Sequence, residues 1–136
     1  MFTILNISVT LSHYLAKVMF HLNGSHKYYL YPLAVDMRKS FYTLSGIVTS
    51  SMNQNVLGGG VFIFVNRNQT IMKILHMEYA GLVIYHKKLD SGRFRLPGFD
   101  ENTVSLTLRW EDLMVMVQSV KPRQKSLKNI NKIQSI

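Results

Sequence analysis

The sequence contains no cysteine in its 136 residues. Without thiols the chain forms neither disulfide bonds nor thiolate metal sites, which excludes disulfide-stapled scaffolds and cysteine-based zinc fingers. A length of 136 residues is typical of one domain, and 47% of apolar residues suffices for a hydrophobic core. We therefore expect one globular domain held by packing alone, and a reducing compartment is compatible with it.

Acidic residues are scarce: seven Asp and Glu stand against 16 Lys and Arg, which gives a formal net charge of +9. A nuclease or transposase active site gathers several carboxylates around divalent metal ions, whereas the acids here are spread over helix starts, turns and a linker. The nucleophile elbow of a serine hydrolase is missing as well. We expect no enzyme, no cofactor and no small-molecule substrate. The positive excess favours partners with phosphate backbones.

Long apolar runs are also missing at the N-terminus. No Lys or Arg precedes Lys17, so the basic start of a signal peptide is absent. Polar residues interrupt the segment before the roughly 20 apolar residues that a membrane span needs. We therefore expect a cytoplasmic protein without a membrane partner. Because the opening Met-Phe pair recurs at Met19, we interpret residues 1–24 as an N-terminal extension that is helical or poorly packed.

The stretch 60–97 organises the rest of the chain. Four short strands, indicated by apolar alternation and turn residues, are predicted at residues 61–66, 71–77, 82–89 and 92–96. The connections between them are too short for crossovers, so neighbouring strands are expected to be antiparallel and to form a meander. Glu78 and Asp90 are the only acids in this stretch, which gives the predicted sheet a positive charge.

Further elements flank this meander. An aromatic strand is predicted at residues 27–33, and apolar residues at helical spacing predict a main helix over 36–52, with Asp36 as its N-cap or first-turn acid. An edge strand is predicted at 104–108, before a helix that Trp110 docks onto the core. The predicted fold class is α+β, a small antiparallel β-meander sheet of about five strands packed against one main amphipathic helix, plus a C-terminal helix.

Basic side chains gather on the predicted meander and beside it. One face of the sheet is expected to meet the main helix, which leaves the other face to carry positive charge. Eight residues are predicted to contact nucleic acid, largely through phosphates and with little sequence preference: Arg38, Lys39, Arg67, Lys73, Lys87, Lys88, Arg93 and Arg95. The alternative interpretation is a basic surface that only keeps the chain soluble.

The α+β domain is predicted to span residues 25–120. The tail that follows, residues 121–136, carries five Lys and Arg and no acid. It cannot bury enough apolar surface to order alone, so we interpret it as a basic disordered tail. A basic arm on nucleic acid and a merely solubilising tail both remain open.

The histidines of the predicted meander suggest one metal arrangement. His76 and Glu78 lie close in sequence, His86 follows on the next predicted strand, and imidazole and carboxylate both bind zinc. Two or three ligands on one strand pair fall short of a complete site. We therefore favour ordinary strand residues or phosphate contacts, and expect no metal site.

Four segments in this order and spacing carry a family resemblance: DMRKSF, VFIFVNRN, KILH and YHKKLDSGRF. From about residue 26 to residue 120 the chain resembles the TnpB-type accessory proteins, products of the second reading frame, of insertion sequences of the "sixty-six" family. The resemblance implies a small non-catalytic protein that transposition requires beside a separate transposase. It implies no catalytic residues.

Charge and resemblance together predict an accessory protein that binds the DNA of the element, its transposase, or both. One alternative is a protein-interaction adaptor that docks an acidic segment of the transposase without touching DNA. A second alternative is an RNA-binding regulator of the element, in which Tyr28, Tyr29 and Tyr31 stack on bases. For these tyrosines we favour packing within the strand.

Overall fold

The structure is a computed structural model that describes residues 22–118. The predicted tail at 121–136 lies outside the described residues, and so does the predicted N-terminal extension up to residue 21.

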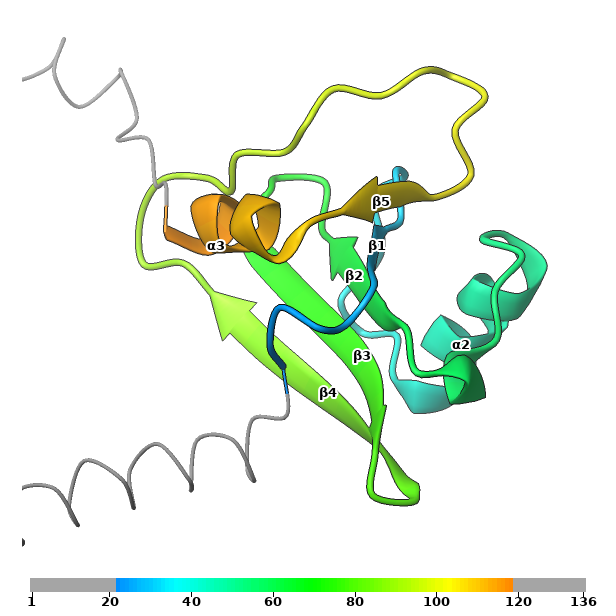
Figure 1. The fold of residues 1–136 in the computed structure, drawn as a ribbon. Helices are drawn as coiled ribbons and strands as arrows, with labels where there is room; N and C mark the ends of the chain where they lie inside the picture. Colours follow the sequence, from blue (N-terminus) through cyan, green and yellow to red (C-terminus); the bar gives the residue numbers. More distant parts are fainter. Residues whose placement is uncertain (1–21, 119–136) are drawn as a thin grey trace, which may run out of the picture.

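The described residues form a five-stranded sheet with the strand order β4-β3-β2-β1-β5. In chain order the strands are β1 (Tyr28–Leu30), β2 (Val61–Val65), β3 (Ile71–Glu78), β4 (Gly81–Lys88) and β5 (Leu106–Leu108). Two α-helices of the described part, α2 (Phe41–Ser50) and α3 (Trp110–Gln118), lie on opposite sides of this sheet (Figure 1). The predicted α+β class, with one main helix and a C-terminal helix, is confirmed.

The strands β2, β3 and β4 form the predicted antiparallel meander. In the β3–β4 hairpin, Ile71 faces Lys88 at one end and Glu78 faces Gly81 at the other. The two residues of its turn, 79 and 80, have φ of 45° and 66°. Positive φ at both positions is the type I′ geometry, whose twist matches that of the flanking strands.

The sheet departs from a pure meander at β1, which pairs with β2 in parallel. A parallel neighbour requires a crossover connection, and α2 with the 3-10 turn η1 (Val56–Gly58) forms it. The predicted edge strand at 104–108 is confirmed in shorter form as β5, which pairs antiparallel with β1. The sheet is therefore mixed, with β4 and β5 as its edges.

The main helix begins later than predicted. Residues 36–40 precede α2, and Ser40 stands at the N-cap position without a side-chain capping bond. Asp36 is not an N-cap: its Oδ1 accepts a hydrogen bond from the Arg38 backbone N–H at 2.9 Å, and its carboxylate binds the Arg38 guanidinium. A local turn therefore uses the carboxylate that the sequence pattern assigned to the helix.

Both faces of the sheet are covered by apolar side chains. The α2 side buries a cluster of Val35, Leu44, Val48, Met52, Phe62, Phe64 and Leu75. The α3 side buries a second cluster, which includes Tyr28, Leu30, Val61, Ile63, Val65, Met72, Ile74, Phe94, Leu113 and Met116. All five residues of β2 are buried, as expected for a central strand packed on both faces. The prediction that one face stays open to carry charge is therefore wrong.

The prediction of a fourth meander strand at residues 92–96 is also wrong. The chain turns away from β4 at Gly92, whose φ is +76°, and continues past the end of α3 (Figure 1). Phe94 is 2% exposed within the α3-side cluster, and its backbone N–H donates to the Gln69 carbonyl at 2.7 Å. Burying Phe94 under α3 replaces pairing along the edge of β4.

Trp110 opens α3 and packs against the α3-side cluster, with its ring 5.6 Å from that of Tyr28. Its predicted role in docking the C-terminal helix is confirmed. Within residues 22–118 no helix has the length and apolar character that crossing a membrane requires.

A basic end of the sheet as candidate nucleic-acid interface

Four of the predicted contact residues meet at one end of the sheet. Here β2 ends, β3 begins and β4 ends, because the three strands are antiparallel neighbours. The Leu89 N–H donates to the Thr70 carbonyl at 2.9 Å, and the bond from Phe94 to Gln69 fixes the following segment to the β2–β3 turn. We call this region the basic end and define it by Arg67, Lys87, Lys88 and Arg93.

Asn66 shapes the turn that presents Arg67. Its side-chain Oδ1 accepts hydrogen bonds from the backbone N–H groups of Thr70 at 2.8 Å and Ile71 at 3.0 Å, and its Nδ2 donates to Thr70 Oγ1 at 3.0 Å. Asparagine side chains commonly bridge turns in this way. The sequence shows Asn66 as a turn former, but it does not show that the turn adjoins Arg93.

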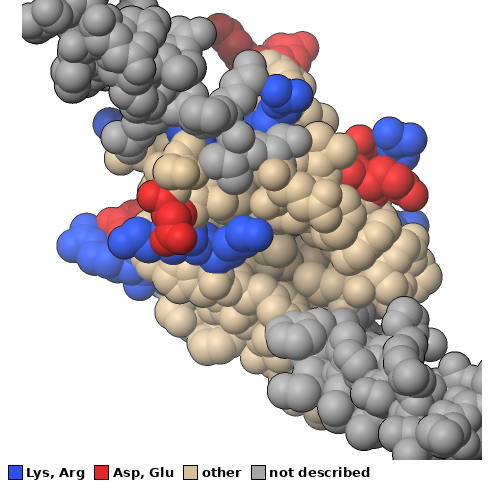
Figure 2. Space-filling view, turned by 90° about the vertical axis from the view of Figure 1, so that its left-hand side faces the viewer, with Lys and Arg blue, Asp and Glu red and all other residues tan. Residues whose placement is uncertain are grey.

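All four residues of the basic end are exposed. Within residues 22–118 the salt bridges are Arg38–Asp36 and Arg109–Asp112, so no described acid pairs with a residue of the basic end. Figure 2 looks onto the molecule from the side of the β4 arrowhead, and Lys and Arg side chains form a band there with acidic residues among them. Exposed, unpaired cations of this kind are suited to phosphate contacts.

Arg38 lies near the basic end but is neutralised. A hollow of about 360 Å³ is lined by both Asp36 and Arg67. Arg38 Nη2 binds Asp36 Oδ2 at 2.6 Å. These hydrogen bonds lower the pKa of Asp36 from 3.8 to about 2, with Arg38 and Lys39 charges adding to the effect, and they raise the pKa of Arg38. The charge of Arg38 is therefore already neutralised by Asp36 before any anionic ligand binds.

Lys73 lies elsewhere than the sequence predicted. It is 8% exposed, and its Nζ donates to the Lys39 carbonyl at 2.7 Å. It faces the α2 side together with Leu75, because alternate residues of β3 point to the same face. Lys73 thus ties β3 to the segment before α2 rather than presenting its charge, and we remove it from the candidate contacts. Lys39 is half-buried.

Arg95 is exposed but faces a different part of the surface. It lines a hollow of about 390 Å³ together with residues of β5 and with Val115 of α3. Within this hollow Asp112 is already bound to Arg109, at 3.1 Å. Arg95 is consequently a flanking cation rather than a member of the basic end.

The structure places His86 of the suggested metal arrangement on the opposite face of the sheet from His76 and Glu78. His76 is 2% exposed, and its Nδ1 lies 3.1 Å from the Gly60 carbonyl, which can only accept, so Nδ1 carries the proton. Glu78 accepts a hydrogen bond from the Tyr85 hydroxyl. His86 pairs with Lys73 and so lies on the other face of the sheet. Among the described residues no group of three or more His, Asp and Glu is placed to hold a metal.

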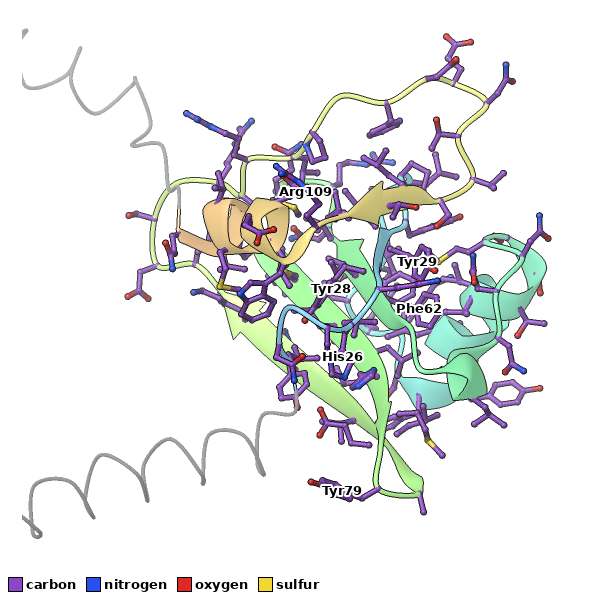
Figure 3. The ribbon with its side chains drawn as sticks, viewed as in Figure 1. His26, Tyr28, Tyr29, Phe62, Tyr79 and Arg109 are labelled. Atoms are coloured by element: carbon purple, nitrogen blue, oxygen red, sulfur yellow. The ribbon has the colours of Figure 1, made fainter. Side chains whose placement is uncertain are left out.

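The tyrosines in β1 and directly after it pack against neighbouring side chains. Tyr28 is fully buried, its hydroxyl donates to the Asn23 carbonyl at 2.6 Å, and burial raises its pKa to about 12. Tyr29 stacks on Phe62 with ring centres 5.6 Å apart (Figure 3), which leaves Gly60 no room for a Cβ atom, since one would approach Phe62 to 2.9 Å. Tyr31 lies against Phe64 at 6.0 Å. The packing interpretation is confirmed for these rings.

Comparison with known proteins places this architecture in a family. The profile of the family described as "IS66 Orf2 like protein" matches residues 26–126. The chain belongs to the IS66 Orf2-like family. The resemblance drawn from its motifs is thereby confirmed.

One curated relative of this IS66 Orf2-like protein is the uncharacterized protein y4hO of Sinorhizobium fredii (strain NBRC 101917 / NGR234). It is 29% identical over 72 residues, which cover 53% of this chain and 63% of the relative. The chain thus spans less than two thirds of the relative's length. No solved structure matches the chain.

Proposed function

We propose that this IS66 Orf2-like protein is a non-catalytic accessory factor of transposition that binds the DNA of its element through the basic end and acts beside the transposase. One observation carries the proposal. Arg67, Lys87, Lys88 and Arg93 come from separate points of the chain, yet they converge on one exposed end without a described acid to pair with them.

The chemistry of the basic end favours phosphates over base edges. Lysine and arginine contacts to the backbone position a protein on DNA but carry little sequence information. The protein therefore binds the ends of the element with weak sequence preference, and sequence selection rests with the transposase. It acts in the bacterial cytoplasm, where the DNA of such an element lies.

The test compares cations that differ only in whether they are paired. Arg67→Gln with Arg93→Gln removes two charges of the basic end, whereas Arg38→Gln with Arg109→Gln removes two arginines that already bind acids. Each phosphate contact makes the slope of log K against log salt more negative by about 0.9. The Arg67→Gln, Arg93→Gln variant should therefore have a slope that is less steep by about 1.8. Gel-shift titrations at several salt concentrations measure it.

The paired-arginine variant is the control, and its slope should stay close to that of the natural protein. Equal slopes for both double variants would remove the basic end from DNA binding. Competition between the element DNA and RNA of the same length distinguishes DNA binding from the alternative of an RNA-binding regulator. The β1 tyrosines give no support to that alternative, because Tyr28 is buried and Tyr29 is stacked on Phe62.

A second candidate function, an adaptor that docks the transposase without DNA, is favoured by a different feature. The outer edge of β4 is unpaired among the described residues. Co-purification of the transposase after nuclease treatment, together with no shift of the element ends, would select the adaptor.

A further inference from the structure

The strand β4 is a long and open edge of the sheet. It has eight residues and pairs on one side only, with β3, among the described residues. The opposite edge, β5, has three residues and is followed closely by α3. An exposed edge presents a row of free backbone groups to which another chain can pair.

The backbone groups that point outward can be assigned from one hydrogen bond. The Leu89 N–H points inward, because it donates to the Thr70 carbonyl at 2.9 Å. Inward and outward groups alternate along an antiparallel strand. The residues of β4 whose N–H and C=O point outward are therefore Leu82, Ile84, His86 and Lys88.

This edge lacks most of the devices by which sheets avoid pairing. Protective devices include prolines, bulges, very short strands and charges. The strand β4 contains no proline, and its register with β3 is unbroken from Ile71↔Lys88 to Glu78↔Gly81. Its first five residues, 81–85, carry no charge. Positive charge occupies only the end at Lys87 and Lys88.

Charge decides which kind of chain suits this edge. Lys87 and Lys88 have no described acid partner, and Arg93 lies at the same end of the sheet. A second copy paired antiparallel would place its own uncharged first residues beside these lysines and would bring a second net charge of +9 to the complex. A segment with apolar residues at one end and acids at the other complements both halves of β4.

We propose that β4 accepts an extended, acidic-ended segment of a partner protein as a sixth strand of the sheet. Main-chain hydrogen bonds from the outward groups supply the pairing, and the acids of the segment lie beside Lys87 and Lys88. The transposase is the chosen source of the segment, and this choice alone rests on the proposed function.

The decisive variant is His86→Pro. His86 is exposed, and its outward N–H is a donor that proline removes without breaking the β3–β4 ladder. The matched control is His86→Thr, which removes the imidazole but keeps the N–H. Both full-length variants should show the circular dichroism spectrum and unfolding midpoint of the natural protein within about the range of ordinary surface substitutions.

Binding is measured on an array of overlapping peptides of about 12 residues from the transposase of the element, long enough to exceed the length of β4. The natural protein and His86→Thr should retain the peptides that combine an apolar half with an acidic half. Because pairing would leave a peptide carbonyl unsatisfied, His86→Pro should weaken these peptides by about tenfold or more. Lys87→Glu with Lys88→Glu should change the preference from acidic to basic peptides.

Three outcomes would overturn the proposal. The first is equal peptide binding by His86→Pro and His86→Thr. The second is that the peptides retained by the protein carry no acids. The third is a dimer in light scattering that His86→Pro dissociates, which would identify a second copy as the occupant. The salt slope of DNA binding should be the same for both His86 variants. Loss of peptide binding with intact DNA binding, or the reverse, therefore separates this proposal from the DNA function.

Discussion

Arg38 and Arg109 contact acids that are close to them in sequence, whereas the basic end brings together cations from separate segments of the chain. Arg38 binds Asp36, two residues away, and Arg109 binds Asp112, three residues away. The basic end instead joins the β2–β3 turn, the end of β4 and the segment after it. Local pairing neutralises Arg38 and Arg109, whereas Asp90, two residues from Lys88 and three from Arg93, forms no salt bridge with them among the described residues. The difference shows that surface charge is set by topology as much as by composition.

The largest effect is expected from a substitution that disturbs the basic end without removing a charged residue. Phe94→Ala leaves a cavity under α3 and should lower the free energy of unfolding by about 3–5 kcal/mol. Because Phe94 fixes the segment that carries Arg93, DNA affinity should also fall under conditions where the variant remains folded. Urea unfolding and gel shifts measure the two effects.

The control for this substitution is Phe99→Ala, since Phe99 is 46% exposed. It should change the free energy of unfolding by no more than about 0.5 kcal/mol. Equal losses of stability for the two variants would contradict the assignment of Phe94 to the core.

A smaller effect is expected at the turn that presents Arg67. Asn66→Ala removes the acceptor of two backbone N–H groups, those of Thr70 and Ile71. The free energy of unfolding should fall by about 1–3 kcal/mol. DNA affinity should fall modestly, because Arg67 is no longer held in place. Asn68→Ala, an exposed position in the same turn, should do neither, and identical behaviour of the two variants would count against the role of Asn66.

The smallest effect comes from converting a paired arginine into an unpaired one. Asp36→Asn frees Arg38, whose partner Asp36 lines the same hollow as Arg67, so DNA binding should strengthen and the salt slope should steepen by up to about 0.9. Asp112→Asn frees Arg109, which belongs to the other arginine–acid pair, and should leave the slope unchanged. A slope that does not change in Asp36→Asn would mean that Arg38 lies outside the DNA contact.

The same ion pair predicts a pH dependence. The pKa of Asp36 is lowered from 3.8 to about 2 in the folded protein. Because this pKa is lowered on folding, the ion pair stabilises the folded protein fully above about pH 4. This stabilisation is lost as the pH falls through about 2. NMR titration of the Asp36 carboxyl carbon should therefore give a midpoint near 2, and a midpoint near the ordinary value would exclude the pair in solution.

Sequence alone determined the features that depend on local pattern. Alternation at period two located β2, β3 and β4, because neighbours on a strand point to opposite faces whatever the fold. Helical spacing located α2 and α3, and the ordered motifs identified the family. Excess positive charge was equally visible without a structure.

Only the tertiary structure decided which neighbours those elements meet. Alternation cannot show that α3 covers the second face, so the open basic face and the strand at 92–96 were predicted wrongly. Lys73 has the same sequence character as Lys87, yet packing beside α2 buries the first and leaves the second exposed. The basic end and the open edge of β4 exist because long-range pairing sets the strand order, and strand order is not encoded in any single local period.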